Sequence, residues 1–157
     1  MDAVEPDAQR PSGDVVFTTN VVVRSYELDA YGHVNNAVYL NYLEAARCDC
    51  LNQVGLSFND FKRWGKVPVV SQAQLRYLAP AYADDVLTVQ TTIVALGRAS
   101  VTMGFELVNQ EGTRVLTATM DFLFLNEQNK PTRVPAAFAE AFSSQPKRLD
   151  QPERRSF

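Results

Sequence analysis

Alternation of apolar and polar residues dominates this 157-residue chain and predicts an antiparallel β-sheet. A β-branched, loosely alternating segment at residues 15–24 predicts the first strand. The remaining extended segments follow from residue 67 onward, where Asn-Gln-Glu-Gly and a short glycine link mark tight turns. These segments cover residues 67–78, 86–96, 100–109 and 114–125. In the first of them the alternation predicts one face with Val67, Val69, Ala73, Leu75 and Tyr77 and the other with Gln72, Gln74 and Arg76.

One stretch departs from this alternation and shows helical spacing instead. Between Ala37 and Gly55 the apolar positions recur every three or four residues, which predicts a helix of about 17 residues. We expect a loop at residues 59–66 before the second strand. A strand, one long helix and a run of antiparallel strands make an α+β arrangement in which the sheet covers the apolar side of the helix. That side carries Tyr39, Tyr42, Leu43, Ala46 and Cys50.

Composition and charge narrow the class of protein. A content of 46% hydrophobic and 21% charged residues is typical of a globular domain. The net charge of −3 argues against a nucleic acid partner, and no apolar run is long enough for a membrane span. The start of the chain lacks the basic and apolar parts of a signal peptide, so we expect a cytoplasmic protein. We place one domain at residues 14–142, between flexible tails at 1–13 and 143–157.

Metal and disulfide chemistry find little support in the sequence. Cys48 and Cys50 are the only cysteines and lie on different sides of one predicted helix, so they are poorly placed to pair. Their spacing matches no metal motif, and His33 has no second histidine with which to share a metal. We therefore expect no metal and no cofactor.

Candidate chemistry gathers immediately before the helix. Asp29 and a Gly-His-Val-Asn-Asn turn precede it, and Asn35 or Asn36 is a natural N-cap. A carboxylate can attack a carbonyl carbon or activate water, and the free N–H groups of a helix start can stabilise negative charge on the carbonyl oxygen. An acid before a helix is more often a cap or a turn former, so these residues alone favour a structural role for Asp29.

The stretch YELDAYGHVNNAVYLNYLEAAR, residues 26–47, resembles the signature of hotdog-fold acyl-CoA thioesterases of the 4-hydroxybenzoyl-CoA thioesterase group. Residues 75–89 and 129–138 are also similar to this family. The resemblance implies the hotdog fold, in which a curved antiparallel sheet wraps a long central helix. It also implies a homodimer or homotetramer with the active site between subunits.

The resemblance further implies roles for individual residues. Asp29 would be the nucleophile or the general base, and the backbone amide of Asn36 would polarise the thioester carbonyl. Glu44, on the helix, is a rival base, although a surface ion pair with Arg47 is the simpler interpretation. Residues that position the substrate would be Gly32, His33, Asn35 and Tyr39. Contacts to coenzyme A would come from Arg98 and Ser100, with Arg76, Lys130 and Arg133 as further candidates.

The sequence therefore predicts an acyl thioesterase that acts on an acyl-CoA or acyl-carrier-protein thioester, with fatty acyl groups favoured. Two alternatives remain open: a hotdog dehydratase or hydratase, and a non-catalytic acyl-thioester binding module. Several aromatic residues could shape the acyl pocket or simply pack the core. These are Phe17, Trp64, Phe105, Phe122 and Phe124.

Overall fold

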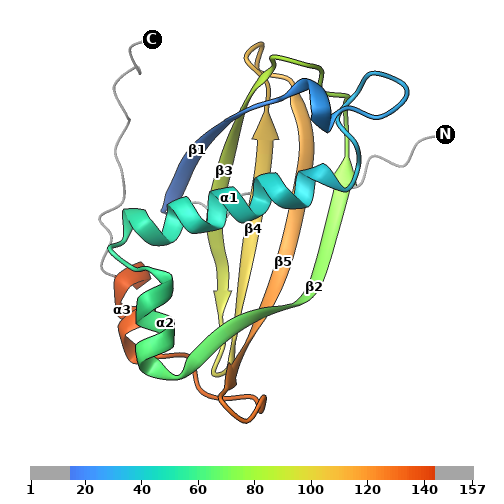
Figure 1. The fold of residues 1–157 in the computed structure, drawn as a ribbon. Coiled ribbons are helices and arrows are strands. Elements are labelled where there is room, and N and C mark those ends of the chain that lie inside the picture. The colour runs from blue at the N-terminus through green and yellow to red at the C-terminus, as the bar shows by residue number, and fades with distance from the viewer. Residues whose placement is uncertain (1–14, 144–157) are drawn as a thin grey trace, which may run out of the picture.

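One long helix lies across a five-stranded antiparallel sheet in the computed structural model, which describes residues 15–143 (Figure 1). The sheet curves around the helix, which confirms the predicted α+β hotdog arrangement. Its strand order is β1-β3-β4-β5-β2, so β1 and β2 form the two edges. The helix is α1 (Val38–Gln53), and the strands are β1 (Val16–Val22), β2 (Lys66–Tyr77), β3 (Val86–Leu96), β4 (Ser100–Val108) and β5 (Arg114–Asn126).

The predicted apolar stripe is the face that α1 turns to the sheet. All five residues of the stripe are at most 5% exposed, and Leu43 is fully buried. The sheet supplies the opposing surface through alternate residues of its inner strands, as the period-two pattern requires. On β4 these residues are Val101, Met103, Phe105 and Leu107, and on β5 they include Leu116, Ala118, Met120, Phe122 and Phe124.

The predicted face of strand β2 is wrong in one respect. The alternation predicts one shared face for Val67, Val69, Ala73, Leu75 and Tyr77. A register shift between Val70 and Gln72 adds one residue to the strand, so Val69 pairs with Leu123 of β5 while Ala73 pairs with Met120. Paired residues share a face, so Val69 and Ala73 lie on opposite faces of the sheet.

Two short helices were missed by the pattern analysis. The predicted loop at 59–66 is wrong, because α2 (Phe58–Trp64) occupies most of it. A capping box between Ser57 and Asp60 starts this helix, and Gly65, with a φ of 64°, ends it. The third helix, α3 (Ala136–Ser143), packs beside α2 at one end of the sheet (Figure 1).

The remaining predictions about the chain concern its ends and membranes. Tail 1–13 lies outside the described residues, as does tail 143–157 apart from Ser143, which ends α3. The domain limits at 14 and 142 therefore stay predictions. Within residues 15–143, each helix is too short or too polar to span a lipid bilayer.

Candidate active site

The loop that precedes α1 is a tight, hydrogen-bonded hairpin. The N–H of Asn35 donates to the carbonyl of Glu27 at 2.9 Å, and the N–H of Asp29 donates to the carbonyl of His33 at 2.7 Å. A β-bridge joins the residues between these two pairs. Gly32 closes the loop with a φ of 86°, a conformation that favours glycine. The pairing therefore holds the acid and the start of the helix in one rigid unit.

The carboxylate of Asp29 has one bonded oxygen and one open oxygen. Its Oδ1 accepts hydrogen bonds from the N–H groups of Tyr31, at 2.9 Å, and His33, at 3.3 Å. Within residues 15–143, Oδ2 receives no hydrogen bond. Asp29 thus shapes its own loop, as the structural interpretation expected, and still leaves one oxygen for chemistry.

The two asparagines before α1 have different roles. The predicted cap at Asn35 or Asn36 is wrong, because the N-cap of α1 is Ala37, which makes no side-chain cap hydrogen bond. Asn35 instead holds the turn before the helix: its Oδ1 accepts from the N–H of Ala37 at 3.0 Å, and its carbonyl accepts from the N–H of Val38 at 2.9 Å. The Asn36 side chain is exposed. Its backbone N–H has no acceptor within the part of the chain that the structure describes. This unpaired amide at the start of the helix is suited to bind a carbonyl oxygen.

Two further predicted residues lie around this loop. His33 is half-buried and packs its ring edge-on against Tyr82, with centroids 5.7 Å apart. Tyr39 is only 3% exposed and packs edge-on against Tyr42 and Tyr77 beneath the loop. Burial raises the pKa of Tyr39, so its hydroxyl stays neutral over a wide pH range. The role of Tyr39 in positioning the substrate stays a prediction.

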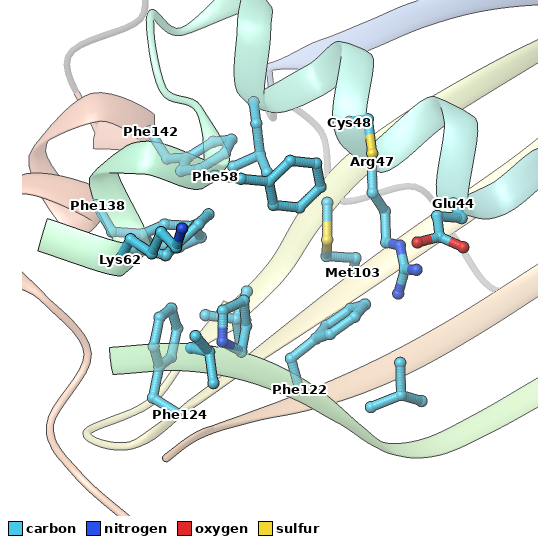
Figure 2. A pocket seen from close by; sticks show the side chains of 16 residues that line it. Glu44, Arg47, Cys48, Phe58, Lys62, Met103, Phe122, Phe124, Phe138 and Phe142 are labelled. Carbon is cyan, nitrogen blue, oxygen red and sulfur yellow. The ribbon is translucent and has the colours of Figure 1, made fainter. Parts of the chain in front are cut away.

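An apolar pocket of about 510 Å³ opens further along α1 (Figure 2). Its volume is typical of a small-molecule site. Of the predicted site residues only Glu44 lines it; Phe122 and Phe124 do so among the five candidate aromatic residues. The sequence analysis missed the phenylalanines of the two short helices, because it did not predict those helices. These are Phe58 and Phe61 of α2 and Phe138 and Phe142 of α3.

Polar groups enter this pocket from α1. The guanidinium of Arg47 lies 4.8 Å from the centre of the Phe122 ring, a cation–π contact. Burial lowers the pKa of Arg47, and the neighbouring Glu44 opposes this effect. Cys48 lies at the wall of the pocket (Figure 2) and is partly exposed. Cys50 is fully buried on another side of the helix, and burial raises its pKa to about 12.

The candidate coenzyme A residues lie far from Asp29 in the same chain. Arg98 and Ser100 are exposed in and beside the turn between β3 and β4, at the end of the sheet near α2 and α3 (Figure 1). The loop of Asp29 lies at the other end, where Val34 donates to the carbonyl of Ala81 just ahead of β3. Since β3 has 11 residues, these ends are roughly 30 Å apart.

Other basic residues accompany Arg98 at that end. The N–H of Val134 donates to the carbonyl of Arg98 at 2.8 Å, and the Lys66 ammonium donates to the carbonyl of Arg133 at 3.1 Å. Lys130 lies in the same connection between β5 and α3. Arg76 lies apart from them, near the other end of β2. Within the described chain, histidine, cysteine and acidic residues form no group of three that could hold a metal ion.

Comparisons with known proteins give the same picture. A family model described as the thioesterase-like superfamily matches residues 23–142. Acyl-acyl carrier protein thioesterase ATL3 of Arabidopsis thaliana is 32% identical over 76% of this chain, which spans only 64% of that protein. Long-chain acyl-CoA thioesterase FadM of Escherichia coli is 34% identical over 69% of this chain and 82% of its own length.

The fold is also that of solved structures. A DHNA-CoA thioesterase from Staphylococcus aureus superimposes with a TM-score of 0.77, covering 82% of this chain and 89% of that one. At 22% identity this likeness concerns the fold alone. Since the family model covers most of the chain, including the loop of Asp29 and all of α1, the protein belongs to the thioesterase-like superfamily.

Proposed function

We propose that this protein hydrolyses acyl thioesters at the loop before α1. The observation that carries the proposal is that, among residues 15–143, one loop holds both an acid with one oxygen free of hydrogen bonds and a backbone amide without an acceptor. Asp29 supplies the first and Asn36 the second. Thioester hydrolysis needs both a group that attacks or activates water and a donor for the carbonyl oxygen.

Two routes use the same atoms. In one, Oδ2 of Asp29 attacks the thioester carbon, the thiolate leaves, and water hydrolyses the resulting anhydride. In the other, Oδ2 takes a proton from water as the water oxygen attacks the carbon, and the tetrahedral intermediate then breaks its C–S bond to release the thiolate and the free acid. In both, the Asn36 N–H donates to the oxygen as negative charge develops on it, an interaction that contributes on the order of 3 kcal/mol. Mass spectrometry of enzyme quenched during turnover separates the routes, because only the first leaves an acyl group on the protein.

We propose a fatty acyl substrate carried by coenzyme A or by acyl carrier protein. The apolar pocket beside α1 offers aromatic walls and few polar groups to an alkyl chain. FadM is named as a long-chain acyl-CoA thioesterase and ATL3 as an acyl-acyl carrier protein thioesterase, so relatives with both carriers support the proposal. The basic residues around Arg98 would meet the phosphates of the carrier.

A second copy of the chain would bring the loop of Asp29 in one subunit close to the basic residues around Arg98 in the other. Strand β2 is a 12-residue edge with exposed apolar side chains, which favours pairing with another strand. Antiparallel pairing of β2 with its own copy is a two-fold contact, and it brings the Asp29 end of one chain toward the Arg98 end of the other. We therefore propose a homodimer or a tetramer of two dimers; a monomer mass in analytical ultracentrifugation would contradict this.

The proposal is tested by following thiol release from acyl-CoA esters of short, medium and long chains and one aryl-CoA, and from an acyl-carrier-protein thioester. Wild type and Asp29→Asn are compared, with circular dichroism to establish folding. We expect turnover by wild type and a loss of most of the rate in Asp29→Asn. If only Glu44→Gln lost activity, the base would be Glu44, which lines the pocket.

Two other results would replace the proposal. Conversion of 3-hydroxyacyl or enoyl thioesters without thiol release would indicate a hydratase or dehydratase. Binding of acyl thioesters without turnover at any chain length would indicate a binding module.

A further inference from the structure

The two peptide units on either side of Asn36 are held from several directions. The Asn35 carbonyl accepts from the N–H of Val38, and the Ala37 N–H donates to the Asn35 side chain. The carbonyl of Asn36 itself accepts a hydrogen bond of 2.9 Å from the hydroxyl of Tyr77. These bonds leave the Asn36 N–H without an acceptor among the described residues.

Tyr77 reaches this peptide from a distant part of the sequence. It is the last residue of β2, 41 positions beyond Asn36. Its ring packs edge-on against Tyr39 at 5.6 Å, and Tyr39 packs against Tyr42 at 5.8 Å. The Tyr42 hydroxyl then donates to the Glu27 carboxylate at 3.1 Å. This row of three tyrosines lies beneath the loop and binds it at both ends, at Asn36 and at Glu27.

We infer that Tyr77 is a positioning residue that acts through the Asn36 peptide, an inference that rests on the proposed thioesterase function. The Asn36 N–H belongs to the peptide unit between Asn35 and Asn36, and the Tyr77 hydroxyl holds the next unit, between Asn36 and Ala37. By fixing that second unit, Tyr77 restrains the backbone dihedral angles of Asn36 and so the direction of its N–H. A donor that is already oriented is what stabilises a developing oxyanion, since no reorganisation is then needed during the reaction. The contact therefore favours the transition state more than the bound substrate.

The inference predicts a specific kinetic change in Tyr77→Phe, which removes one oxygen atom. We expect kcat to fall roughly three- to tenfold, the effect of one neutral hydrogen bond, while KM stays within about twofold. Tyr26→Phe is the matched control, because Tyr26 is 83% exposed and its hydroxyl makes no hydrogen bond within the described residues. We expect Tyr26→Phe to keep the wild-type kcat.

A second measurement does not depend on turnover. In ¹⁵N–¹H correlation spectra, Tyr77→Phe should shift the Asn36 amide and accelerate its hydrogen exchange, and Tyr26→Phe should do neither. An unchanged Asn36 amide, an unchanged kcat in an active enzyme, or a raised KM at constant kcat would each overturn the inference. Inactive wild type would contradict the proposed function instead, and the amide spectra would still decide whether Tyr77 orients Asn36.

Discussion

The pocket beside α1 predicts how the rate depends on acyl chain length, and Cys48 allows this to be tested in the native sequence. Its thiol is partly exposed at the pocket wall, so an alkyl methanethiosulfonate would attach an alkyl chain inside the pocket. Cys50 should not react near pH 8, because it is fully buried and its pKa is raised to about 12. The labelling should therefore add a single alkyl group.

The expected loss in kcat/KM follows from the apolar area that the acyl chain buries in the pocket. Each methylene that enters an apolar pocket contributes ~0.8 kcal/mol, or about fourfold in kcat/KM, until the pocket is full. A butyl group on Cys48 would occupy the space of about four methylenes, and excluding them costs about 3 kcal/mol. We therefore expect kcat/KM for a long-chain acyl-CoA to fall by about 200-fold at most. Acetyl-CoA, which does not enter the pocket, should be hydrolysed at an almost unchanged rate.

The assay follows the loss of thioester absorbance, so that no thiol reagent interferes with the label. Cys48→Ser, treated in the same way, is the control for reaction elsewhere, and reduction of the mixed disulfide should restore the original rates. Equal losses for long and short substrates would refute the reasoning, because they would indicate general damage to the enzyme. Unchanged hydrolysis of long chains by the labelled protein would place the acyl group outside this pocket.

Two further predictions concern stability. Leu43→Ala, in the fully buried stripe of α1, should lower the free energy of unfolding by about 2–5 kcal/mol in urea denaturation; a loss below about 1 kcal/mol would contradict the described packing. The raised pKa of Cys50 predicts alkaline destabilisation: from pH 9.0 to about 12 the unfolded thiol has lost its proton while the folded one keeps it. Stability should fall by up to ~1.4 kcal/mol per pH unit in that window, and unfolding titrations of Cys50→Ala should show a correspondingly smaller slope.

Much of the fold was predictable because its signals are local. The change from alternating to helical spacing near Ala37 depends on neighbouring residues alone, and so do the strands on either side of the hairpin at 109–112. The signals for α2 were also local: a capping box at Ser57 starts this helix and Gly65 ends it. The Phe-Lys-Arg-Trp segment inside that helix is too short to show a helical stripe, which explains why a loop was predicted there.

The pocket could not be predicted, because its walls come from distant parts of the chain. Phe61, Phe124 and Phe138 pack ring against ring, although up to 77 positions separate them in sequence. A buried phenylalanine of the core and one that lines a cavity have the same pattern in sequence. The hydrogen bond from Tyr77 to Asn36 could not be predicted for a similar reason. The sequence indicates only which side of a sheet Tyr77 occupies.

The proposed chemistry and the proposed selectivity for acyl chain length therefore depend on different parts of this chain. The proposed catalytic pair depends on the loop before α1, where Asp29 accepts hydrogen bonds from N–H groups of its own loop and Asn35 accepts one from the N–H of Ala37. The proposed acyl pocket depends on how α2 and α3 pack against the sheet some distance along α1. Because the two share no residue, substitutions at Phe138 or Phe142 should change the preferred chain length and leave the requirement for Asp29 intact. A pocket variant that lost activity toward every chain length, yet remained folded, would show that the two parts are coupled.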